Sequence, residues 1–283
     1  MPLYSVYGNR LDTDVSFPEL ALADRGPARW RFRIDPELPP MHDAVERGSE
    51  LIYGNVHARL FAHRRGLRVI IDDTGDFDIA PNGVIVAATK PEAWDDFVRN
   101  HLLGRVLAIA MFEAGWLPLH ASAIETPEGV VAFLGPNSVG KSSLAVALTT
   151  LGATPVADDT LPIEAGPPPR AWPGLPAVRV RDDVREALHL PQDGIATHEG
   201  KTALLPPPEH RPPRAPKPLA GIYLVAPNED LSREAVVLRI PFPPVLAAPA
   251  ILAHVRAAAM LGPTAVPTIL QRISPIVGVV PVH

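Results

Sequence analysis

The chain has 283 residues, of which 47% are hydrophobic, so it is long enough to bury a substantial core without covalent cross-links. It contains no cysteine, which excludes disulfides, thiolate metal sites and a cysteine nucleophile. Its net charge of −5 gives it no general attraction to nucleic acid or to anionic lipid.

The first 90 residues are expected to form a β-rich region. Residues 29–34 alternate polar and apolar side chains, a pattern that is typical of a half-buried strand. Turn-forming residues separate the apolar segments that follow. These segments predict strands at 51–61, 67–72 and 84–88.

From residue 91 the apolar side chains recur at helical spacing, and Pro91 is a suitable first residue for a helix over 91–114. The alternation that follows implies a βαβ unit with parallel strands. Its elements are expected at 119–124 (strand), 130–134 (strand), 141–151 (helix) and 154–157 (strand). Later elements are expected at 222–225 and 235–240 (strands) and at 247–261 (helix). We therefore divide the chain into a β-rich region, 1–90, and a second domain, 91–283, of alternating strands and helices.

Proline makes up 35 of the 283 residues, more than twice the usual share of about 5%. It concentrates in segments 166–176 and 205–218, where composition favours extended surface loops. Because these loops follow the catalytic motifs, we expect them to form an acceptor site together with the N-terminal region.

Residues 135–142 fit the pattern G-x-x-x-x-G-K-[ST] of a phosphate-binding loop. An apolar strand leads in and a helix leads out, so loop amides and the positive helix end would converge on phosphate oxygens. Lys141 would place its charge between the β- and γ-phosphates, and Ser142 would offer its hydroxyl to Mg²⁺. A plain strand-to-helix turn is the alternative. The predicted phosphate-binding residues are Gly135, Pro136, Asn137, Ser138, Val139, Gly140, Lys141, Ser142 and Ser143.

Asp158 and Asp159 end the apolar stretch that follows the loop's helix, where a metal-holding carboxylate is expected. Adjacent residues of a strand point to opposite sides, so one carboxylate can hold Mg²⁺ while the other faces an acceptor. A turn or a helix cap would also explain the pair. His120, taken alone, would be interpreted as a packed core histidine.

Together, His120-Ala-Ser-Ala, the loop and Ala157-Asp-Asp resemble the catalytic core of HPr kinase/phosphorylase. The chain is more similar to a branch of small HPr-kinase-like proteins, some of which phosphorylate lasso peptide precursors. Segments 7–8, 17–20 and 173–179 carry this further likeness. The resemblance implies an α/β fold with a P-loop core of the HPr-kinase (PEP-carboxykinase-like) type behind a β-rich N-terminal region.

The resemblance also implies roles for individual residues. Asp158 would be the general base on the acceptor hydroxyl, and His120 would orient it. Asp159 would hold Mg²⁺ together with Ser142. Lys201 and Arg179 would contact the phosphates or the acceptor, although each could also be an ordinary exposed cation. Pro136-Asn137 replaces the Asp-Ser usual in HPr kinases, which argues against HPr as the substrate.

These observations predict a kinase that uses ATP and Mg²⁺ to phosphorylate a serine hydroxyl of a peptide or protein, such as a ribosomally made precursor. A small-molecule kinase and a non-catalytic ATP-binding regulatory module are the alternatives. No secretory signal and no apolar run of about 18 residues is evident. We therefore expect a cytoplasmic protein with neither a nucleic-acid nor a membrane partner, and homo-oligomer formation stays open.

Overall fold

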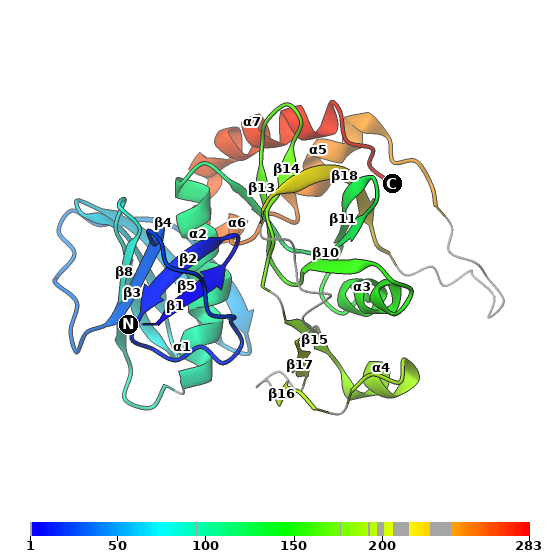
Figure 1. The fold of residues 1–283 in the computed structure, drawn as a ribbon. Coiled ribbons are helices and arrows are strands. Elements are labelled where there is room, and N and C mark those ends of the chain that lie inside the picture. The colour runs from blue at the N-terminus through cyan, green and yellow to red at the C-terminus, as the bar shows by residue number, and fades with distance from the viewer. Residues whose placement is uncertain are drawn as a thin grey trace.

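The computed structural model describes residues 2–93, 95–175, 177–191, 193–196, 201–205, 215–226 and 239–283. The fold is mixed α/β with a large share of strand. Its strands form an eight-stranded sheet, a seven-stranded sheet and a small three-stranded sheet. Figure 1 shows the first sheet as a curled layer beside a long helix, and the second sheet on the other side of that helix.

The eight-stranded sheet is built from the N-terminal residues and has the strand order β1-β2-β3-β8-β7-β6-β5-β4. β2, β3 and β8 run parallel to one another, and the remaining neighbours are antiparallel. Its strands are β1 (Leu3–Val6), β2 (Asn9–Thr13), β3 (Trp30–Ile34), β4 (Val45–Tyr53), β5 (Val56–His63), β6 (Gly66–Ile71), β7 (Gly75–Ile79) and β8 (Val84–Thr89). The predicted β-rich character of this region is confirmed.

The single strand predicted over 51–61 is wrong, because the chain reverses in its middle. β4 and β5 pair antiparallel from Val45↔Ala62 to Tyr53↔Val56. The turn between them holds Gly54 at φ +51°, a left-handed conformation that glycine adopts without the strain that a Cβ brings. The apolar residues on both sides of this turn made two strands look like one.

The predicted helix 91–114 forms, but it begins later and changes its winding. It consists of α1 (Asp95–His101), the π-helical η1 (Leu102–Val106) and α2 (Leu107–Glu113). Asp95 and Asp96 occupy the first turn, where negative charge complements the helix dipole. The η1 and α2 segments are buried almost throughout and belong to the same apolar core as both large sheets.

The seven-stranded sheet has the order β12-β10-β11-β18-β14-β13-β9. The predicted βαβ unit is present as β11, α3 and β12, but β10 lies between its two strands and is antiparallel to both. The parallel neighbour of β11 is β18. The strands are β9 (Leu117–Leu119), β10 (Ala121–Thr126), β11 (Gly129–Leu134), β12 (Thr154–Ala157), β13 (Leu161–Glu164), β14 (Arg170–Ala171) and β18 (Lys217–Leu224), and the crossover helix is α3 (Lys141–Thr150).

The strand predicted over 119–124 is divided at His120. β9 lies at one edge of the seven-stranded sheet, and β10 lies near the other. The backbone N–H of His120 donates to His254 O at 2.7 Å, so this residue leaves the strand ladder and pairs with the C-terminal part. The break therefore places His120 between the seven-stranded sheet and the C-terminal helical segment.

The remaining elements are a small sheet, which packs against α3, and the C-terminal helices. The small sheet has the order β15-β17-β16; its strands are β15 (Val178–Val180), β16 (Ile195–Ala196) and β17 (Thr202–Leu204), and α4 (Asp182–Ala187) follows β15. The helix predicted over 247–261 is two helices, and a further one follows that was not predicted. These helices are α5 (Pro244–Leu252), α6 (Ala258–Leu261), the 3₁₀ turn η3 (Pro263–Ala265) and α7 (Val266–Val277).

The predicted strand 235–240 and the second proline segment fall mostly outside the described residues, which omit 206–214 and 227–238. Within the described ranges, no helix combines the length and the apolar character needed to cross a membrane.

Candidate functional site

The phosphate-binding loop has the local geometry that its glycines allow. β11 ends at Leu134 and α3 begins at Lys141. Gly135, Ser138 and Gly140 all have positive φ, at +156°, +65° and +100°. A Cβ on Gly135 would lie 2.6 Å from Val225 O, whereas one on Gly140 would meet no atom within 4 Å. The loop therefore packs tightly at its start and opens into free space at the helix N-terminus.

Lys141 is folded back onto this loop. Its Nζ donates to Gly135 O at 2.8 Å and to Pro136 O at 2.9 Å, and the residue is only 7% exposed. Burial lowers the pKa of Lys141, and the charges of Asp158 and Asp159 oppose that change. In the described part of the chain, both hydrogen-bond partners of this ammonium group are neutral carbonyls.

Asp158 is surrounded by neutral hydrogen-bond donors. Its Oδ1 accepts the hydroxyls of Ser122 and Ser142, each at 2.7 Å, and its Oδ2 accepts the backbone N–H of Arg179 at 2.9 Å. The residue is buried. A carboxylate and a hydroxyl in contact at the start of α3 are the oxygen ligands that Mg²⁺ prefers, so Ser142 and Asp158 fit this ion.

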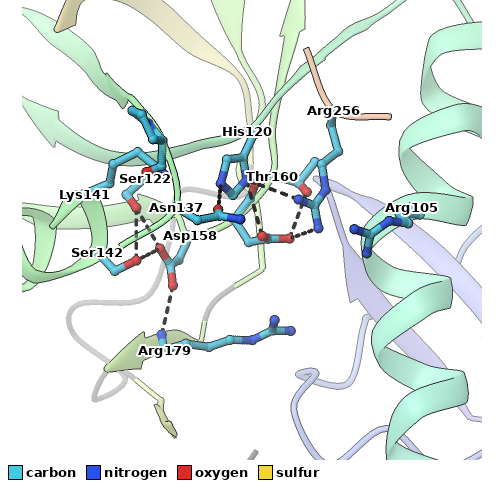
Figure 2. A network of polar contacts seen from close by, with 12 residues as sticks. Arg105, His120, Ser122, Asn137, Lys141, Ser142, Asp158, Thr160, Arg179 and Arg256 are labelled. Carbon is cyan, nitrogen blue, oxygen red and sulfur yellow. Dashed lines mark hydrogen bonds and ion pairs between the residues drawn. The ribbon is translucent and has the colours of Figure 1, made fainter. Parts of the chain in front are cut away.

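Asp159 is surrounded by cationic and polar groups instead. Arg256 Nη2 lies 3.0 Å from its Oδ2, and His120 Nδ1 lies 3.4 Å from its Oδ1. Burial by itself would raise the pKa of Asp159, but the charge of Arg256 and the contact with His120 hold it well below the ordinary value. The residue has a left-handed backbone, with φ +74°. Figure 2 shows Asp158 beside Ser122 and Ser142, and Arg256 on the side of His120.

His120 lies between the aspartate and the loop. Its Nδ1 is 3.0 Å from Asp159 O, and its Nε2 is 2.9 Å from Asn137 Oδ1. The predicted partner of His120 was Asp158; the structure brings it to Asp159 instead, and it brings Asp158 to Ser142. Both aspartates follow the end of β12 at Ala157, where the alternation of side chains along a strand no longer applies.

Arg179 and Lys201 were predicted to contact the phosphates or the acceptor. Both line the pocket that also contains Asp158 and Asp159. Arg179 contributes its backbone N–H to Asp158, and its guanidinium donates to Asn100 Oδ1 at 2.8 Å. Because Asn100 belongs to α1, Arg179 joins the aspartate pair to the N-terminal half of the molecule.

The pocket that contains these groups has a volume of about 670 Å³, within the usual range for small-molecule sites. One wall is the loop and α3, with Asn137, Ser138, Gly140, Lys141, Ser142 and Ser143. The opposite wall comes from β4 and the long helix, with Ile52, Tyr53, Phe97, Asn100, His101 and Arg105. Gly135, Pro136 and Val139 are not among the residues that line it.

Arg256 is the site residue that sequence reasoning missed. Besides its contact with Asp159, its Nη1 lies 3.3 Å from His120 Nδ1. It sits between α5 and α6, and its backbone N–H donates to Pro118 O at 2.8 Å. No motif surrounds it in the sequence, so only the packing of the C-terminal segment on β9 reveals it.

Ser122 and Tyr7 were also not assigned roles. Ser122 lies on β10, two residues after His120, and supplies the second hydroxyl that donates a hydrogen bond to Asp158. The hydroxyl of Tyr7 donates to Leu103 O at 2.5 Å, and burial together with the charge of Asp159 raises its pKa. A Cβ at the neighbouring Gly8 would lie 2.5 Å from Trp172, so segments 7–8 and 172–179 meet beside the site.

No family model matches the chain, and no curated protein matches it. Among the described residues, no group of three or more metal-ligating His, Asp or Glu side chains is present. A metal ion held by one carboxylate, one hydroxyl and substrate phosphates does not need such a group. The assignment of chemistry therefore rests on the geometry of the pocket itself.

Proposed function

We propose that the protein is a kinase that transfers the γ-phosphate of ATP to a hydroxyl group, with a P-loop core of the HPr-kinase-like type. The observation that carries this proposal is the position of the aspartate pair. One carboxylate touches the P-loop serine, and its neighbour faces the other part of the same pocket beside a histidine and an arginine. A pocket that only bound nucleotide would need the first carboxylate and not the second.

On the donor side, Lys141 would leave its two carbonyl partners for the β- and γ-phosphates. Ser142 and Asp158 would hold Mg²⁺, which would offset the negative charge of the phosphates. Ser122 would keep Asp158 oriented through its 2.7 Å hydrogen bond. Ser142 keeps its predicted role, and we assign the metal to Asp158 in place of Asp159.

On the acceptor side, Asp159 would accept the proton of the attacking hydroxyl. The oxygen of that hydroxyl forms the new bond to phosphorus, the bond to the ADP oxygen breaks, and the proton moves to the carboxylate. Because Asp159 has a low pKa, it is a weak base that takes the proton late, as fits a transition state with little bond formation. His120 and Arg256 would hold it in place.

The acceptor is proposed to be a serine of a peptide or protein. The wall that faces Asp159 comes from β4, α1 and η1, so the N-terminal region closes the part of the pocket that an acceptor would enter. The two alternatives remain a small-molecule kinase and an ATP-binding regulatory module. The described part of the chain does not include most of the second proline segment, whose part in an acceptor site stays a prediction.

The test is mass spectrometry after incubation of the protein with Mg-ATP and two panels of acceptors. One panel contains serine peptides, including peptides that end in serine, and the other contains free sugars and amino alcohols. We expect one phosphate on a peptide, and none when Asp159→Asn replaces the parent protein. Phosphate on small molecules only would establish the first alternative. Nucleotide binding with no transfer to any acceptor would favour the second.

A further inference from the structure

A second pocket lies in the N-terminal half of the molecule, away from the nucleotide site. Its volume is about 500 Å³. It is lined by residues of the eight-stranded sheet and by the end of α2, with Ala110, Glu113 and Ala114. The other pocket is lined by Asn100 and His101 of α1. The two pockets therefore contact different segments of the same long helix, and their nearest lining residues on it, Arg105 and Ala110, are about 8 Å apart along its axis.

Two buried polar atoms of the residues that line this pocket have no partner. The indole Nε1 of Trp30 and the imidazole Nε2 of His63 are buried, and neither makes a hydrogen bond within the described part of the chain. Trp30 is 3% exposed, and so is the side chain of His63. Asp78 Oδ1 is 3.6 Å from His63 Nε2, but it already accepts Arg68 Nε at 2.6 Å. Such atoms are rare in folded proteins because leaving them unpaired lowers stability.

The charged groups at this pocket favour an anion. Arg29 and Arg47 both line it, and Glu113 is the single carboxylate among its lining residues. No described carboxylate forms an ion pair with either arginine. The guanidinium of Arg29 lies over the rings of Trp30 and Trp116, at 5.2 and 4.9 Å from their centroids. Stacking fixes the plane of the guanidinium and leaves its N–H edge available for an oxyanion.

The rest of the lining is apolar and includes Leu67, Ile79 and Ala110. A free inorganic anion would satisfy the arginines but would leave this surface without contacts. A compound with one oxyanion group on a small apolar body would use both kinds of surface, as most small-molecule sites do.

We propose that this pocket binds a small organic oxyanion, either a carboxylate or a phosphate ester, at a site separate from the nucleotide site. The arginines would hold the charged group, and the apolar lining would contact the body of the compound. This inference does not depend on the kinase activity.

The test uses the full-length protein and four probes at matched ionic strength: benzoate, phenyl phosphate, inorganic phosphate and neutral benzamide. Saturation-transfer NMR and calorimetry measure binding to the parent protein and to three variants. Arg47→Gln removes one cation, Ala114→Phe fills the pocket from an exposed position, and Arg64→Gln is the control, an exposed arginine that does not line it.

We expect benzoate or phenyl phosphate to bind more tightly than benzamide and inorganic phosphate. Which of the two binds more tightly distinguishes a carboxylate site from a phosphate-ester site. Affinity should fall at least tenfold in Arg47→Gln and in Ala114→Phe, and it should stay unchanged in Arg64→Gln. Equal binding of benzamide and benzoate, equal binding by all variants, or no binding of any probe at millimolar concentration would overturn the proposal. Thermal stabilisation by Mg-ATP should be the same in all four proteins, which separates this result from the outcome at the nucleotide site.

Discussion

Asp158 and Asp159 are adjacent in the chain, yet they belong to two regions with opposite electrostatic character. Two serine hydroxyls and one amide surround the first, and these donors stabilise its charge without cancelling it. An arginine and a histidine surround the second. The hydrogen-bond donors of Asp158 are neutral, whereas Asp159 forms an ion pair with Arg256. The comparison teaches that two carboxylates adjacent in the chain, the second with φ +74°, can have entirely different partners.

The largest expected effect is on turnover in Asp159→Asn. Loss of a general base typically lowers the rate by about 10²–10⁴. Because Asp159 does not touch the P-loop serine, we expect nucleotide affinity to stay near that of the parent protein. Calorimetry for binding and mass spectrometry for product would separate the two quantities. Normal turnover would remove Asp159 from the acceptor side and return that role to Asp158.

The next effect is on nucleotide binding in Lys141→Ala. Hydrogen bonds to a charged group contribute about 1.5–3 kcal/mol, so affinity for Mg-ATP should fall by one to two orders of magnitude. The rise in melting temperature produced by Mg-ATP should shrink accordingly. Lys217→Ala is the matched control, because Lys217 pairs with Glu125 at 2.8 Å on β18. Equal shifts in both variants would contradict the donor-side assignment.

A smaller effect is expected on stability in Arg256→Gln. Removing Arg256 leaves the Asp159 carboxylate with the weaker contacts of His120 and Thr160, so we expect a loss of about 2 kcal/mol in the free energy of unfolding. Arg99→Gln provides the control, since Arg99 and Glu19 form an ion pair with similar exposure, 19% and 21%, against 17% and 22% for Arg256 and Asp159.

Arg256→Gln and Arg99→Gln should also differ in the pH dependence of the reaction rate. In Arg256→Gln the pKa of Asp159 should rise toward its ordinary value, which moves the acid limb of the rate profile to higher pH. An equal loss of stability in Arg99→Gln and Arg256→Gln, with no change in the pH profile, would show that Arg256 has only a structural role.

The smallest effect is on acid stability. Because the folded protein holds the pKa of Asp159 well below 3.8, the unfolded chain binds a proton first as the pH falls. The contribution of Asp159 to stability is therefore full above about pH 5 and decreases below that value. Urea unfolding between pH 5 and 3 should show a steeper loss in the parent protein than in Asp159→Asn. Parallel curves would mean that the ion pair with Arg256 does not hold the carboxylate in its charged form.

The two regions also differ in how far the sequence predicts them. The residues proposed for the donor side are contiguous: strand, loop, helix and Asp158 lie within 30 residues. The motif and its spacing therefore located them, but they did not distinguish the partners of Asp158 from those of Asp159. The acceptor side is assembled from β9, the turn after β12 and the segment between α5 and α6, and Arg256 has no local signal.

The differences in fold have similar causes. The strand break at His120 depends on pairing of its N–H with His254 O, a contact between residues far apart in the chain. The β4–β5 hairpin was merged into one strand because one glycine turn separates two apolar segments. The eight-stranded order, in which β3 and β8 are neighbours, requires pairing that periodicity alone cannot predict.

The central claim is that Asp158 serves the metal and Asp159 serves the acceptor. The most direct measurement is the Mg²⁺ dependence of nucleotide binding in Asp158→Asn, Asp159→Asn and the parent protein. We predict that Asp158→Asn raises the Mg²⁺ concentration for half-maximal nucleotide binding at least tenfold, and that Asp159→Asn leaves it within about twofold of the parent value. A raised requirement in Asp159→Asn with a normal one in Asp158→Asn would contradict the account and assign the metal to Asp159.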